Sequence, residues 1–352
     1  MSVVDRIRSS DGALARVVAG RRRRSARRRA ILLGLGVLIV AAFVVTLMVG
    51  RTFYGPDEVL AVLFGRDVQG ATFTVGRLRL PRAVLAVVAG AAFGMSGAAF
   101  QTMLRNPLAS PDIIGITWGS GAAAAFAIVV LGLGGAPVSA IAIVAGLAVA
   151  LAIYLLSRRG GLVGLRLVLI GIGVAAMLHA VTLYILSKAP DWEAQEAMRW
   201  LAGSLNGANW QSAAPVLVAL TVLGPVLVLL ARDLDALRLG DDTAAGLGVR
   251  TERTRLLVLV AAVGLLAFAT AATGPIAFVA FLAGPIASRL VGADRPVLVP
   301  AALIGALLVI VADFTGQFLV GARYPVGVIT GVLGAPYLLF LIIRSNRTGG
   351  SP

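Results

Sequence analysis

Long apolar runs separated by charged residues constrain the fold of this chain more than any other feature. Hydrophobic residues make up 59% of its 352 positions and charged residues only 13%, whereas a soluble domain carries roughly 25% charged residues. A helix needs about 20 apolar residues to cross the hydrocarbon core of a bilayer, and several runs reach that length. The sequence therefore predicts an all-α integral membrane protein.

Breaks within the two longest runs set the number of helices. The charge-free stretch Ile113–Ser157 is interrupted by "GLGGAP" at 132–137, and Leu256–Ser288 by "TGP" at 273–275. Glycine and proline clusters of this kind end helices, so each stretch is expected to form two. The sequence then predicts ten membrane helices in a domain spanning 30–343. The other six spans are Ala30–Gly50, Ala83–Leu104, Leu167–Ser187, Ala213–Ala231, Pro296–Phe318 and Pro325–Ile343.

Small residues mark one face of the second span. Gly90, Gly94 and Gly97 recur at helical spacing in "GAAFGMSG". Small side chains let membrane helices approach closely. This face is therefore predicted to be a tight helix–helix contact rather than a ligand site.

The distribution of arginine predicts the orientation. An even number of spans places both termini on one side, and "RRRRSARRR" at 21–29 marks that side as cytoplasmic by the positive-inside rule. We expect a basic cytoplasmic tail, 1–29, that contacts membrane lipid, and a cytoplasmic C-terminal tail, 344–352. The same rule accounts for the net charge of +15. The basic runs lack the interleaved aromatic residues of a nucleic-acid platform, so nucleic acid is not an expected partner.

The spans hold few groups that could perform chemistry. His179, the only histidine, falls within the fifth span, and Asp313 lies in the ninth. The chain has no cysteine and no HExxH or GxxxxGK[ST] pattern. We therefore expect no catalytic residue, no metal ligand and no cofactor bound by this chain. His179 is interpreted as an interior or pore-lining residue rather than a proton carrier.

A polar insert, Leu237–Arg255, interrupts the apolar pattern. Its "GDDTAAGLG" portion predicts one short helix, with Asp241 as the N-cap, Asp242 in the first turn and Gly246 or Gly248 at the end. A solvated connector is one interpretation. A connector needs neither this length nor a cap, so we prefer a preformed cytoplasmic helix on which a motor subunit docks.

Two arginines at the start of the second span also need an explanation. Arg79 and Arg82 are spaced to share a helix face, and their charge is unfavourable at a helix N-terminus and on the external side. Arginines that are not stabilised by their own helix are expected to contact an acidic partner outside the membrane. Contact with phospholipid headgroups is the alternative.

Four long strings resemble one family of membrane proteins. They are "RLPRAVLAVVAGAAFGMSGAAFQTMLRNPLASPDIIGI", "LRLGDDTAAGLGV", "TGPIAFVAFLAGPIASRLVG" and "YPVGVITGVLGAPYLLFLI". On these strings the chain is similar to the FecCD family of ABC importer permeases, which move ferric siderophores, haem and cobalamin. Three shorter matches, "RNPLASPDIIG", "GSLNGANW" and "GDDTAAGLGV", look most like the permeases for ferric enterobactin.

The resemblance implies roles for particular residues. Coupling helices that dock on an ATPase would include Leu237, Arg238, Gly240, Asp241, Asp242, Ala245, Leu247 and Gly248. An extracytoplasmic binding protein would contact Arg79, Arg82 and Arg323. The fifth and tenth helices would line the translocation path, and its path and gate residues would include Gly161, Gly164, His179, Pro325, Gly327 and Thr330.

Two positions depart from the pattern of the family. Gln317 stands where many members have a third arginine, and Arg323 replaces the acid of an "ELP" motif. Both departures fit one half of an asymmetric permease pair.

The resemblance implies a type II ABC importer permease in a bacterial cytoplasmic (inner) membrane. It would work with a second, different permease subunit, two copies of an ATPase that binds the ATP, and an extracytoplasmic siderophore-binding protein. The expected cargo is a ferric siderophore of the catecholate, enterobactin-like type, passing through a cavity lined by small apolar residues. A cobalamin or haem importer permease is the first alternative, and an ion-coupled secondary transporter is the second.

Overall fold

The structure is a computed structural model that describes residues 3–111, 115–157, 163–292 and 296–348. Every regular element in these ranges is a helix. The elements are α1 (Val3–Met48), α2 (Pro56–Leu63), η1 (Thr72–Arg79), α3 (Leu80–Met103), α4 (Ile116–Val129), α5 (Ala136–Ser157), α6 (Val163–Lys188), α7 (Asp191–Leu201), α8 (Trp210–Leu229), α9 (Ala231–Leu237), α10 (Asp241–Gly246), α11 (Thr251–Thr273), α12 (Val279–Val291), α13 (Leu298–Phe318) and α14 (Val326–Thr348).

The apolar helices follow the predicted spans. Among the described residues, seven helices are long and apolar enough to cross a membrane, and α4, α12 and α14 contain shorter apolar segments. Both predicted breaks are confirmed, because α4 and α5 are separated at 130–135 and α11 ends at Thr273 before Gly274, which has φ +67°. The crossing of the membrane by all ten stays a prediction.

Two helix boundaries differ from those expected. The second span begins at Thr72 rather than Ala83, because the π-helix η1 runs directly into α3. Arg79 is the last residue of η1, and Arg82 lies in the first turn of α3. The basic tail and the first span form one helix, α1, with no break at residue 29, since arginine is a good helix former.

The helix α3 forms the centre of the bundle. It packs against α8, α11, α12 and α13. Gly90 meets the backbone of Gly305 on α13, and Gly97 meets the backbone of Ala280 on α12, so closely that a Cβ atom at either position would collide with backbone atoms. The predicted glycine contact of the second span is therefore confirmed.

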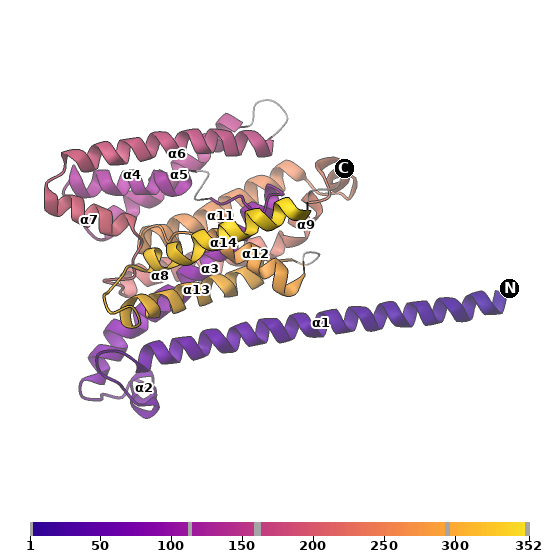
Figure 1. Cartoon of the computed structure of the whole chain (residues 1–352), viewed down its shortest axis with the longest axis horizontal. Coiled ribbons are helices and arrows are strands. Elements are labelled where there is room, and N and C mark those ends of the chain that lie inside the picture. Colours follow the sequence, from indigo (N-terminus) through magenta and orange to yellow (C-terminus); the bar gives the residue numbers. More distant parts are fainter. Residues whose placement is uncertain (1–2, 112–114, 158–162, 293–295, 349–352) are drawn as a thin grey trace.

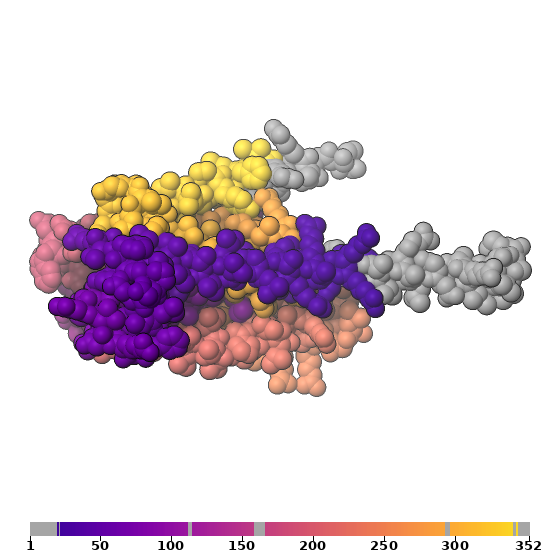
Figure 2. Space-filling model, turned by 90° about the horizontal axis from the view of Figure 1, so that it is seen from below, coloured from indigo at the N-terminus to yellow at the C-terminus, as the bar shows by residue number. Residues whose placement is uncertain are grey.

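The ends of the bundle separate the predicted sites. Figure 1 places the N-terminal end of α1, the helix α9 and the C-terminal end of α14 at one end of the molecule, called here the α9 end. The helices α2 and α7 lie at the opposite end, called the α7 end. In Figure 2, α1 runs along the outside of the bundle. Figure 1 also shows α4–α7 as a group beside the remaining helices.

Candidate functional site

The polar insert begins at the last residue of the short helix α9 and contains one short helix of its own, α10, before α11 starts at Thr251. The helix α10 starts at Asp241, and its N-cap is Gly240, with φ +112°. The prediction that Asp241 caps the helix was therefore wrong. Its carboxylate instead accepts hydrogen bonds from Arg105 and from Arg255, the latter at 2.7 Å. Asp242 lies in the first turn, as predicted.

The end of α10 has the geometry of a Schellman motif. Gly248 has φ +85°, its N–H donates to Ala245 O at 2.9 Å, and the Val249 N–H donates to Ala244 O at 3.0 Å. A residue in the left-handed conformation stops a helix in this way, and glycine adopts it without a steric cost. The prediction that a glycine ends the helix is confirmed.

The insert is anchored on one face and open on the other. Leu234, Leu237 and Ala244 are buried in the main hydrophobic core, and Arg105 Nε donates to Leu237 O at 2.6 Å. By contrast, Leu239 and Leu247 are each 65% exposed. The coupling residues Arg238, Asp242, Ala245 and Gly248 are also exposed. A fixed surface with apolar side chains among charged ones is typical of a docking site.

The arginines at the start of the second span have local partners. Arg82 forms a bidentate ion pair with Asp313 of α13, with Nε–Oδ2 2.9 Å and Nη2–Oδ1 2.8 Å. Its Nη1 donates to Asn206 Oδ1 at 3.0 Å. Asp313 is 3% exposed and also accepts from Gln317 Nε2 at 2.7 Å. Gln317 thus supports the ion pair.

Arg79 contacts the C-terminal end of α1. Its guanidinium donates to the carbonyl oxygens of Leu47, Met48 and Thr52 at 2.8, 3.0 and 2.6 Å, and it lies 5.2 Å from the ring centroid of Tyr54. The premise that the two arginines have no stabilising contacts within the chain was wrong. Their side chains contact different helices rather than forming one common surface. Their contact with a binding protein stays a prediction, as does that of Arg323, which is exposed near the start of α14.

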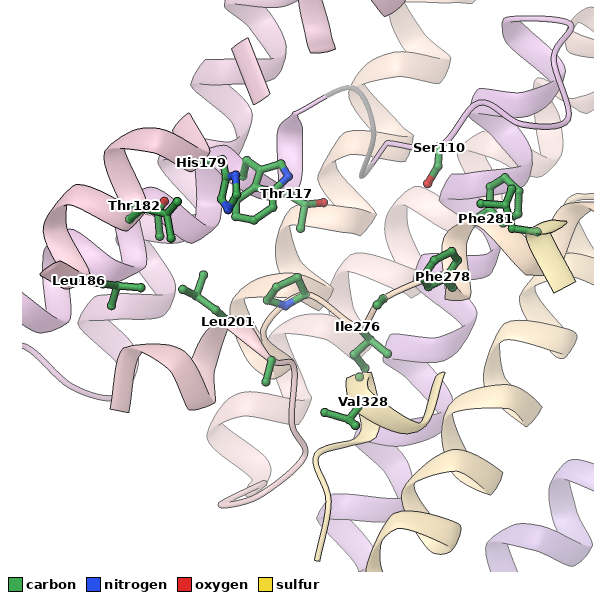
Figure 3. A pocket seen from close by; sticks show the side chains of 17 residues that line it. Ser110, Thr117, His179, Thr182, Leu186, Leu201, Ile276, Phe278, Phe281 and Val328 are labelled. Carbon is green, nitrogen blue, oxygen red and sulfur yellow. The ribbon is translucent and has the colours of Figure 1, made fainter. Parts of the chain in front are cut away.

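A cavity of about 530 Å³ lies between α6 and α14. Figure 3 shows side chains from α4, α6, the α11–α12 connection and α14 around it. His179 and Gly327, both expected on the path, line this cavity. The expected small-residue lining is only partly found, because Trp118, Phe278 and Phe281 place aromatic rings in the wall.

The other expected gate residues lie around the cavity or away from it. The Gly327 N–H donates to Gly203 O at 3.0 Å, and Thr330 Oγ1 donates to Gly327 O at 3.2 Å, so the hydroxyl of buried Thr330 faces its own helix. Pro325 directly precedes α14, and Gly164 lies in the first turn of α6. Gly161 lies outside the described residues.

Sequence reasoning missed the aromatic residues of the wall. Trp118 was a lone tryptophan in an apolar run, and nothing local indicated that α4 faces α6 at this point. Phe278 is the N-cap of α12 and has φ +63°, a conformation that is strained for a bulky residue. Its side chain packs against Gly334 of α14, a contact that depends on the tertiary fold.

The apolar helices, the polar insert and the cavity define the membrane-embedded subunit of a transporter. Residues 38–344 match the model of the FecCD transport family. The chain belongs to this family, and it is a non-catalytic permease subunit of an ABC transporter for siderophores or other iron chelates.

Several characterised permeases are similar to this chain. The ferric enterobactin permease FepG of Escherichia coli is 42% identical over 316 residues, covering 88% of this chain and 96% of FepG. FepD of the same organism, also a ferric enterobactin permease, is 36% identical, covering 90% and 96%. The Fe(3+)-citrate permease YfmE of Bacillus subtilis is also 36% identical, covering 88% and 93%. A solved inward-facing ABC transporter of the metal-chelate type superposes with a TM-score of 0.80 at 27% identity, covering 90% of this chain and 99% of that one.

Proposed function

We propose that this chain is one of two different permease subunits in a bacterial inner-membrane importer for ferric catecholate siderophores of the enterobactin type. The similarity to both FepG and FepD, two separate permeases for ferric enterobactin, supports a pair of unlike subunits. The match to a citrate permease means that the cargo has to be tested directly. Two ATPase subunits would bind and hydrolyse ATP, and an extracytoplasmic binding protein would deliver the chelate.

The anchored insert is the observation that carries this proposal. Movement can pass from an ATPase to the membrane helices only through an element that is fixed to them. The helix α10 meets this condition, because Asp241 is bound by Arg105, which follows α3, and by Arg255 of α11. The exposed Leu239 and Leu247 would enter the ATPase surface, and the α9 end would face the cytoplasm.

The path would follow the cavity between α6 and α14. Both helices were expected to line it, and residues of both contribute to its wall. The cavity would widen or close as the ATPases bind and release nucleotide. At the α7 end, Arg323 and the exposed parts of Arg79 and Arg82 would contact the binding protein.

A substitution at α10 tests the coupling role. We expect Leu247→Asp to prevent capture of the ATPase, because it places a charge in a contact that would otherwise bury an apolar side chain. Phe64→Asp is a matched control, since Phe64 is 81% exposed and follows α2 at the α7 end. Equal capture by wild type and Leu247→Asp in detergent would refute the docking surface.

Purification from native membranes tests the assembly, and an uptake panel tests the cargo. Recovery of a P-loop ATPase with a second, different permease supports the proposal. Recovery of an ATPase without another permease favours a homodimer and the cobalamin or haem alternative. Uptake of cobalamin but of no ferric siderophore would exclude the proposed cargo, and transport that stops with an uncoupler while ATP is maintained would indicate a secondary transporter.

A further inference from the structure

Two aromatic rings, those of Trp118 and His179, lie against each other in the cavity wall. The rings of Trp118 and His179 lie 4.3 Å apart between centroids, inclined by 46°. Trp118 is in the first turn of α4, and His179 is in the middle of α6. Figure 3 shows His179 at one end of the cavity, with Phe278 and Phe281 toward the other.

The position of the pair is set by close backbone packing. Gly115, the N-cap of α4, has φ +91°. A Cβ atom at Gly115 would be 2.9 Å from Gly171 O and 3.0 Å from Ala175 N of α6. The start of α4 therefore lies directly against α6, and Trp118 comes three residues after Gly115.

The pair differs from ordinary core packing. His179 is exposed although it lies in a predicted span, and a polar ring in a membrane helix is costly unless it faces a polar cavity or a ligand. Thr182, one turn further along α6, also lines the cavity, but its hydroxyl donates to Leu178 O at 2.8 Å and so turns to its own helix. Aromatic rings therefore lie at both ends of the cavity, and the imidazole of His179 lies beside the indole of Trp118.

We propose that Trp118 and His179 form a recognition site for the aryl rings of a catecholate chelate during its passage. This inference rests on the proposed function and deepens it by assigning residues that favour one class of chelate. Offset and edge-to-face contacts between aromatic rings are favourable beyond the burial of their surface. An imidazole N–H also donates a strong hydrogen bond to an anionic oxygen, such as those of a ferric catecholate.

A recognition site on a transport path has to bind its ligand weakly. A ligand in transit must bind well enough to enter and loosely enough to leave. One ring contact corresponds to a change of about twofold to tenfold in apparent affinity, which is enough to favour aryl chelates without trapping them. Chelates without aromatic rings, such as hydroxamates, would gain nothing from the indole ring.

The test is transport by the complete importer in proteoliposomes, with its binding protein and iron-55-labelled ferric enterobactin. We expect Trp118→Ala and His179→Ala each to raise the KM for uptake by about twofold to tenfold. Trp118→Phe keeps an aromatic face and should retain most of the wild-type KM. Leu186→Ala, another cavity-lining substitution on α6, is the control for loss of volume.

Three outcomes separate the possibilities. A wild-type KM in both alanine variants would overturn the inference and leave the proposed function intact. Equal impairment of Trp118→Phe and Trp118→Ala, with poor recovery of the complex, would assign Trp118 to packing and would also overturn it. If the wild-type importer carries no ferric catecholate, the proposed cargo fails, and the aryl site fails with it.

Discussion

The ion pair between Arg82 and Asp313 joins α3 to α13 at the α7 end, and its removal should destabilise the protein measurably. We expect Asp313→Asn to keep the shape of the side chain and remove its charge. The exposure of the two side chains is 19% for Arg82 and 4% for Asp313. The asparagine would offer one oxygen to the donors of Arg82 and Gln317, where the carboxylate accepts three hydrogen bonds.

The size of the effect follows from burial. Removing one partner of a buried ion pair costs about 3–5 kcal/mol, because the other charge is left without compensation. Arg82 keeps its hydrogen bond to Asn206 and has some access to solvent, so we expect a loss of about 2–4 kcal/mol. The double variant Arg82→Gln/Asp313→Asn removes both charges and should be more stable than Asp313→Asn alone.

Thermal unfolding of the purified protein in detergent, followed by tryptophan fluorescence, checks this expectation. An unchanged Tm for Asp313→Asn, or a double variant that is less stable than either single variant, would refute the reasoning. The result also affects how binding-protein docking is measured. Reversing the charge of Arg82 would break this ion pair, so a loss of docking in that variant would not identify a direct contact. Arg323→Glu avoids this problem, and we expect it to weaken docking without lowering the Tm.

Three further predictions concern other parts of the chain. Asp241→Ala should loosen α10 and reduce transport per ATP hydrolysed in reconstituted complexes, whereas its exposed neighbour Asp242→Ala should have a smaller effect. Burial raises the pKa of the Asp235 carboxyl, so its charged form lowers the stability of the folded protein at pH values above the raised pKa. Asp235→Asn should therefore raise the Tm at neutral pH. This gain in Tm should disappear as the pH falls below the ordinary aspartate pKa of about 4. Gly90→Val should lower the Tm and the yield of folded protein, because a side chain would collide with the backbone of Gly305.

The sequence predicted features that depend on local rules. The breaks at 132–137 and 273–275 are confirmed because glycine and proline end helices whatever surrounds them. The glycine face of α3 is confirmed because a membrane helix has few other uses for small residues at helical spacing. The end of α10 at Gly248 follows the same kind of rule.

Features that depend on distant residues were missed. Arg82 and Asp313 are separated by 231 positions, and no local pattern joins them. One signal was available, because a lone carboxylate in a predicted span calls for a partner, and Arg82 was unexplained. Asp241 suits an N-cap by residue type, but Arg105 and Arg255 reach it only in the folded protein. The aromatic wall has the same origin, since it needs α4, α6 and the α11–α12 connection together.

Arginines mark both ends of the apolar segment of α1. At its C-terminal end, Arg79 binds the carbonyl oxygens of Leu47 and Met48. At the other end of the apolar segment, Arg22, Arg23, Arg24, Arg27 and Arg29 are exposed, and successive positions of a helix place them on all sides of it. If α1 crosses the membrane as predicted, sliding along the membrane normal would pull one of these two sets of arginines into hydrocarbon, and the cost of burying charge there opposes such sliding. The helix α13 packs along α1, so the same constraint would extend to α13.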